Sequence, residues 1–238
     1  DALKTSSGTM TVTDSILGTR PTTGAGNIVV QVDTNSSQDF SNLSLTGIET
    51  IQFTGNSTFS GDFVNSKIVV NSGVTLTTTM DKLTDKTSNL SGAGNVRLSD
   101  ASVIASSVNQ VAGAVSGVVT ATVSADTAAN LNTNLVNATA SDVLTLTLTD
   151  TILASGSNLI SLNGKTSVDI NATSVTSITD TYTNINTIYN GTGISGLGNE
   201  AVTISDTTNA TNVNGILNKT TGIVTAIVTA DTAANLNT

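Results

Sequence analysis

A fifteen-residue segment occurs twice in this chain, and this repetition constrains the fold more than any other feature of the sequence. Residues 119–133 and 224–238 are identical at 13 of their 15 positions, and both end in ADTAANLNT. A divergent third copy, residues 175–187, keeps an aspartate, two threonines and two asparagines in register. Self-similarity of this kind is typical of arrays in which each repeat packs on its neighbours.

A second kind of repeat unit alternates with the first, and together they place one aspartate in every repeat. The phased aspartates are Asp100, Asp126, Asp150, Asp180, Asp206 and Asp231. Their sequence numbers advance by 26, 24, 30, 26 and 25 in turn. We therefore predict a coil of about 26 residues, and two coils form one double repeat whose length is about 50 to about 56 residues.

The hydrophobic period changes at each of these aspartates. Before Asp150, residues 143–148 alternate Val, Leu and Thr with the two-residue rhythm of a strand. After Asp206, Val213, Ile216 and Leu217 follow helical spacing. A carboxylate at this junction can accept the free N–H groups in the first turn of the helix that follows it. We therefore expect each coil after about residue 95 to contain a strand, a capping aspartate and a short helix.

The N-terminal part of the chain has a different pattern, with short apolar segments separated by Gly, Asn and Ser. Apparent helices are scarce there, and we predict a β-rich segment over residues 1–95, followed by a strand–helix segment over residues 96–238. The expected strands are residues 28–32, 43–45, 50–53, 67–70, 74–76 and 96–98.

These patterns predict a repeat solenoid rather than a closed globule. A coil of this length cannot enclose a core, so its apolar stripe is buried only when another coil stacks on it. We expect a right-handed parallel β-solenoid first and strand–helix coils later, with stacked strands about 4.7–4.9 Å apart. The in-register residues Asn130, Asn184 and Asn235 either form hydrogen-bonded ladders between coils or mark turns.

Composition excludes several classes of function. The 238 residues include no Cys and no His, so disulfides, thiolate nucleophiles and imidazole bases are absent. A net charge of −9 opposes binding to nucleic acid. No apolar run reaches the roughly 18 residues of a membrane span. Thr (45), Ser (28) and Asn (26) dominate the chain, which gives a polar surface with few charges.

Three segments carry a resemblance to known proteins: residues 43–56 (LSLTGIETIQFTGN), 193–208 (GISGLGNEAVTISDTT) and 228–237 (VTADTAANLN). They resemble repeats of very large bacterial surface and secreted proteins, of the adhesin, sheath or surface-layer type. The resemblance implies an extracellular or cell-surface location. The GGxGxD nonapeptide that binds calcium in related solenoids does not occur here.

The phased aspartates support two interpretations. They either cap helices or, with Asn and backbone oxygens, bind Ca²⁺, which takes six to eight oxygen ligands. Capping is the better explanation, because each coil supplies one carboxylate and no dense cluster. We therefore predict no metal site and no cofactor, with calcium as the alternative. Asp81 and Asp85, interleaved with Lys82 and Lys86, are expected on a solvated face.

No catalytic or cofactor-binding residue is predicted. Asp142 and Asp150 are the nearest approach to a carboxylate pair, but eight extended residues separate them by more than about 20 Å. Threonine-rich strands at residues 74–79 and 144–150 suggest a third role, a flat face that binds ice or crystals.

The function expected from the sequence is a non-catalytic structural segment of an extracellular bacterial surface protein, acting as a spacer or assembling into a filament or surface layer. Copies of the chain, stacked end to end or laterally, are the expected partners, and cell-surface polysaccharide is another. The alternative is an adhesive module for a glycan, mineral or ice face. Since Thr238 ends the sequence at the phase of Thr133, we expect further coils from the parent protein or from neighbouring molecules.

Overall fold

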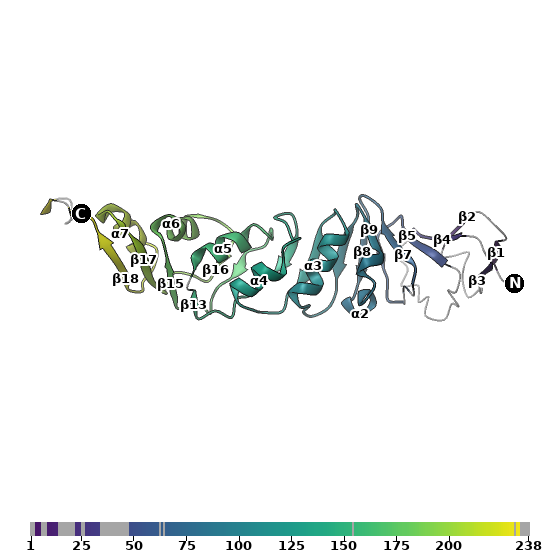
Figure 1. Ribbon diagram of the computed structural model, residues 1–238, viewed down its shortest axis with the longest axis horizontal. Coiled ribbons are helices and arrows are strands. Elements are labelled where there is room, and N and C mark those ends of the chain that lie inside the picture. Colours follow the sequence, from purple (N-terminus) through teal and green to yellow (C-terminus); the bar gives the residue numbers. More distant parts are fainter. Residues whose placement is uncertain are drawn as a thin grey trace. The chain divides into compact units, whose positions relative to one another are not determined.

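The computed structural model describes residues 3–5, 9–13, 22–24, 27–33, 48–61, 63, 65–153, 155–230 and 232–233, and the statements below concern these residues. They form an α/β fold in which every observed strand pairing is parallel. The chain divides into two compact units, residues 1–122 and 123–238, which are described separately. Most of their helices and strands are labelled in Figure 1.

One sheet of the first unit contains strands that pair in chain order. These are β2 (Thr9–Thr13), β4 (Asn27–Val32), β5 (Ile48–Phe53), β7 (Lys67–Val70) and β9 (Leu90–Gly92). Alternate side chains of β7 are buried, as the two-residue period requires. The strands expected at residues 28–32, 50–53 and 67–70 are confirmed, whereas the one expected at 43–45 lies outside the described residues.

The first unit also contributes strands to a second parallel sheet. It contains β6 (Ser57–Thr58), β8 (Thr75–Thr78), β10 (Asn95–Leu98) and β11 (Val119–Thr122). Leu76 pairs with Val96, and Val96 pairs with Val119, so equivalent apolar residues lie above one another. The strands expected near residues 74–76 and 96–98 are confirmed. Separately, β1 (Leu3–Thr5) pairs with β3 (Thr22–Gly24).

Three phenylalanines form the aromatic part of the first unit's core. Phe53, Phe59 and Phe63 are all fully buried. The rings of Phe59 and Phe63 stack with centroids 4.3 Å apart, and Phe53 meets the Phe59 ring edge-on at 5.9 Å. Ile68 of β7 and Leu76 of β8 are also buried completely. Stacked strands thus share one continuous apolar interior.

The main sheet of the second unit also follows chain order. It contains β13 (Ile152–Leu153), β15 (Ser177–Asp180), β17 (Ala201–Thr208) and β18 (Val224–Val228). The shorter strands β14 (Ile170–Asn171) and β16 (Ile194–Ser195) pair with each other.

The register of this sheet gives the length of each coil. Leu153 pairs with Ile178, Ile178 with Val202, and Val202 with Val224. The sequence number therefore advances by 25, 24 and 22 from one coil to the next. These steps are slightly shorter than the coil of about 26 residues that the aspartate spacing predicts.

Residues 143–148 behave as their alternation predicts. Leu144, Leu146 and Leu148 are buried, and the threonines between them face outward. Strand β12 (Val143–Thr145) forms the first half of this segment. The two-residue period therefore identified the correct inner face.

From Met80 on, short helices follow the strands in the described residues. The first unit contains α2 (Met80–Leu83), a 3-10 turn at Thr87–Asn89 and α3 (Ala105–Ala114). The second contains α4 (Ala128–Asn134), α5 (Gly156–Asn163), α6 (Tyr182–Asn190) and α7 (Ala210–Leu217). Helix α2 lies in the segment expected to contain strands, and the boundary predicted near residue 95 falls at the start of β10.

The helices of the second unit pack on one another in chain order, from α4 to α7 (Figure 1). The inner face of α6 carries Ile185 and Ile188, which are buried. Of the three α7 residues named for their helical spacing, Ile216 is buried and Val213 is half-buried, but Leu217 is exposed, so the spacing is wrong at Leu217. The parallel strands are consistent with the predicted solenoid. Among the described residues, no helix has the length and apolar character needed to cross a membrane.

Candidate functional site

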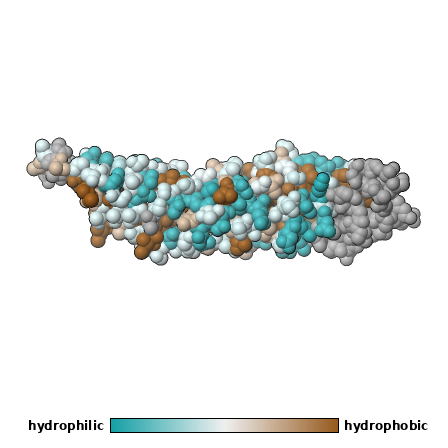
Figure 2. All heavy atoms as spheres, in the orientation of Figure 1, coloured by the Kyte–Doolittle hydropathy of each residue, from teal (hydrophilic) through white to brown (hydrophobic). Residues whose placement is uncertain are grey.

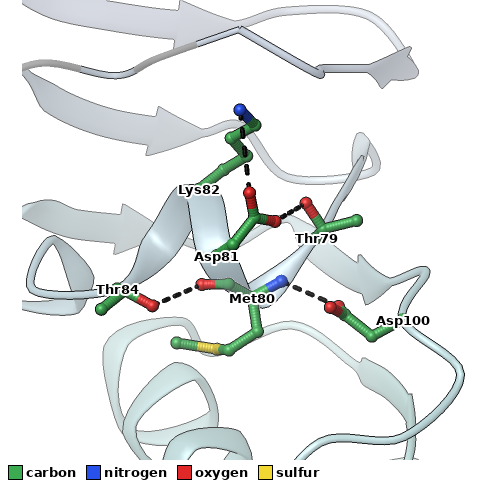
Figure 3. A network of polar contacts seen from close by, with 6 residues as sticks. All are labelled: Thr79, Met80, Asp81, Lys82, Thr84 and Asp100. Atoms are coloured by element: carbon green, nitrogen blue, oxygen red, sulfur yellow. Dashed lines mark hydrogen bonds and ion pairs between the residues drawn. The ribbon is translucent and has the colours of Figure 1, made fainter.

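Asp100 shows which backbone groups the phased carboxylates bind. Its Oδ2 accepts the backbone N–H of Met80 at 2.8 Å, and Met80 is the first residue of α2. Figure 3 shows the Asp100 side chain directed at this helix start. The aspartate therefore caps a helix that begins 20 residues before it, in the neighbouring coil.

The same contact recurs in the second unit. Each carboxylate accepts an N–H from the first or second residue of the preceding helix, which belongs to the neighbouring coil. The bonds are Asp150 to Ala128 at 2.7 Å, Asp180 to Ser157 at 2.9 Å and Asp206 to Tyr182 at 2.7 Å. We call Asp100, Asp150, Asp180 and Asp206 the bridging aspartates.

The prediction that each aspartate caps the helix of its own coil is therefore wrong. The N-cap positions of α4, α6 and α7 are Thr127, Thr181 and Asn209, whose side chains accept the N–H three residues later. These residues are extended and lie directly before the helix, which is the geometry that an N-cap needs. In α4 and α6 the aspartate stands one residue earlier.

The second carboxylate oxygen is held within its own coil. Oδ1 of Asp180 accepts the Thr181 N–H at 2.7 Å and the Asn184 side-chain N–H at 2.9 Å. Oδ1 of Asp126 accepts the same two donors from Thr127 and Asn130. The Asp-Thr-x-x-Asn spacing thus fixes the carboxylate in position, and in Asp180 it leaves Oδ2 directed at the neighbouring coil.

This arrangement corrects both interpretations of the in-register asparagines. Asn130 and Asn184 lie in the first turns of helices and bond to their own aspartates, so they neither form ladders nor mark turns. Asn235 lies outside the described residues. An amide ladder does occur, but in the first unit, where Gln31 donates to Gln52 at 3.4 Å and Gln52 donates to Asn71 at 3.1 Å.

Hydrogen bonding also sets the ionisation of Asp180. Burial alone would raise the pKa of its carboxyl group, but the N–H donors of Thr181, Asn184, Ser157 and Gly156 outweigh that effect. The pKa of Asp180 is therefore lowered below its usual value. The ionised form is the one that bridges the two coils.

Asp81 is a different kind of carboxylate. Its side chain is 69% exposed and lies 3.7 Å from the Lys82 ammonium group (Figure 3). A hydrogen bond from Thr79, and secondarily Lys82, lowers the pKa of Asp81. The expected solvated face is confirmed at this residue.

Glu200 is a buried carboxylate that the sequence patterns do not reveal. It is fully buried, and its Oε2 accepts the N–H groups of Gly198 at 2.7 Å and Asn199 at 3.1 Å. Its Oε1 accepts the hydroxyl of Tyr189. Burial raises the pKa of the Tyr189 hydroxyl, and the adjacent Glu200 raises it further. The loop that supplies the N–H donors depends on Gly198, whose φ of +130° favours glycine.

Asp142 is buried as well, and it holds a turn of its own coil. Its Oδ2 accepts the Thr139 N–H at 2.8 Å and the Thr139 hydroxyl at 3.2 Å. Asp150, the other member of the carboxylate pair considered above, binds the start of α4. Both carboxylates thus have partners within the protein.

No three acidic side chains in the described ranges come together to form a group that could hold a metal ion. Removal of metal is a direct test of the calcium alternative. We expect EDTA to leave the melting temperature and the sedimentation coefficient unchanged, because backbone N–H groups already donate hydrogen bonds to the bridging carboxylates. A rise in melting temperature on adding Ca²⁺ to the EDTA-treated chain would contradict this expectation. Mg²⁺ at the same ionic strength is the control.

Comparison with known proteins gives no relative: no protein-family model, curated protein or solved structure matches this chain. The resemblance to giant bacterial surface proteins remains an expectation based on the repeat style.

Proposed function

We propose that this chain is a non-catalytic structural segment of an extracellular bacterial surface protein, built as a right-handed solenoid that acts as a spacer or assembles through its coils. The observation that carries the proposal is the row of bridging aspartates. The carboxylate of each accepts a hydrogen bond from the start of a helix in the neighbouring coil. The repeated polar groups therefore attach one coil to the next.

The remaining repeated polar groups support the same function. The Asn132 side chain of α4 donates to the Asn158 carbonyl of α5 at 2.6 Å, and Asn163 donates to the Thr192 carbonyl at 2.9 Å. In the first unit, the Asn95 side chain accepts the Val118 N–H at 2.9 Å. Short amide side chains thus bridge neighbouring coils in both units. These contacts add to the parallel strand pairing and give each coil a defined position on the next.

A spacer must tolerate a change in the number of its coils, and this gives a prediction. We expect a chain that carries a second copy of residues 153–201 after residue 201 to fold cooperatively, because Leu153 and Val202 occupy equivalent register positions. Two added strand spacings should lengthen the particle by about 10 Å, measured as the maximum dimension in small-angle X-ray scattering.

The matched control is an insertion that breaks the register. A second copy of residues 178–189 after residue 189 adds only half a coil, so it should misplace the next strand and lower the melting temperature. If the full two-coil insertion unfolds the chain or leaves its length unchanged, the spacer proposal fails. Antibodies that label intact cells of the source organism test the proposed surface location.

A further inference from the structure

We draw no further inference here: the strongest candidate, the outer face of the β15–β17–β18 sheet, where Thr179, Thr203 and Thr225 pair in register beside exposed apolar side chains of β18 (brown in Figure 2), is an unpartnered sheet face, and nothing in the described residues shows what covers it.

Discussion

Replacing Glu200 with alanine is expected to lower the free energy of unfolding by about 3 kcal/mol. The substitution removes the acceptor of three donors, namely the Tyr189 hydroxyl and the N–H groups of Gly198 and Asn199. Glu200 is fully buried, so these donors lose their acceptor away from bulk solvent. Urea denaturation followed by circular dichroism measures the loss.

Two controls separate the hydrogen bonds from the volume of the side chain. Glu200→Gln keeps the volume and one acceptor oxygen, so we expect a loss of about 1 kcal/mol. Asp169→Ala removes an exposed carboxylate and should change stability by less than about 0.5 kcal/mol. Equal stabilities of the Glu200→Ala variant and the wild type would show that this carboxylate does not hold the loop.

Glu200 also illustrates which part of the structure is hidden from the sequence. Strands could be predicted from the alternation of residues such as Leu144, Leu146 and Leu148, since burial of alternate side chains follows directly from strand geometry. Glu200 has no counterpart at the same phase of the other repeats, and a single acidic residue gives no periodic signal. Its burial depends on the Gly198 loop, which only the folded chain defines.

The bridging aspartates show a second limit of sequence reasoning. The spacing correctly places one carboxylate in each coil, but it does not say which helix the carboxylate serves. Asp180 lies two residues before α6 in sequence and 23 residues after Ser157 of α5, yet it bonds to Ser157. Local proximity favours the wrong helix, and only the stacking of coils brings the correct one within reach.

The same geometry predicts that the stacked coils lose stability in acid. The pKa of Asp180 is lowered by folding, so its contribution is fully present above the unfolded value of about 3.9 and is lost as the pH falls through the folded value. Protonation removes negative charge from the oxygens that accept the Thr181 and Ser157 N–H groups. We therefore expect the melting temperature to be constant near neutral pH and to fall below about pH 4.

A triple substitution isolates the bridging carboxylates from general acid effects. An asparagine has one acceptor oxygen. At position 180 it can accept the N–H of Thr181 in its own coil or the N–H of Ser157 in the neighbouring coil, but not both. We expect Asp150→Asn, Asp180→Asn and Asp206→Asn together to cost about 3 kcal/mol at pH 7, about 1 kcal/mol each, since Asp150 and Asp180 are partly exposed, Asp206 is exposed, and solvent screens all three.

The charge-matched control replaces the exposed residues Asp33, Asp85 and Asp169 with asparagine and should stay within about 1 kcal/mol of the wild type. Urea titrations at pH 7 and pH 3 measure all three proteins. The difference between the wild type and the bridging variant should shrink at pH 3 through Asp180, because folding lowers the pKa of that carboxyl group and its contribution is lost as the pH falls below the unfolded value. A difference that is independent of pH would mean that the carboxylate charge does not hold the coils together.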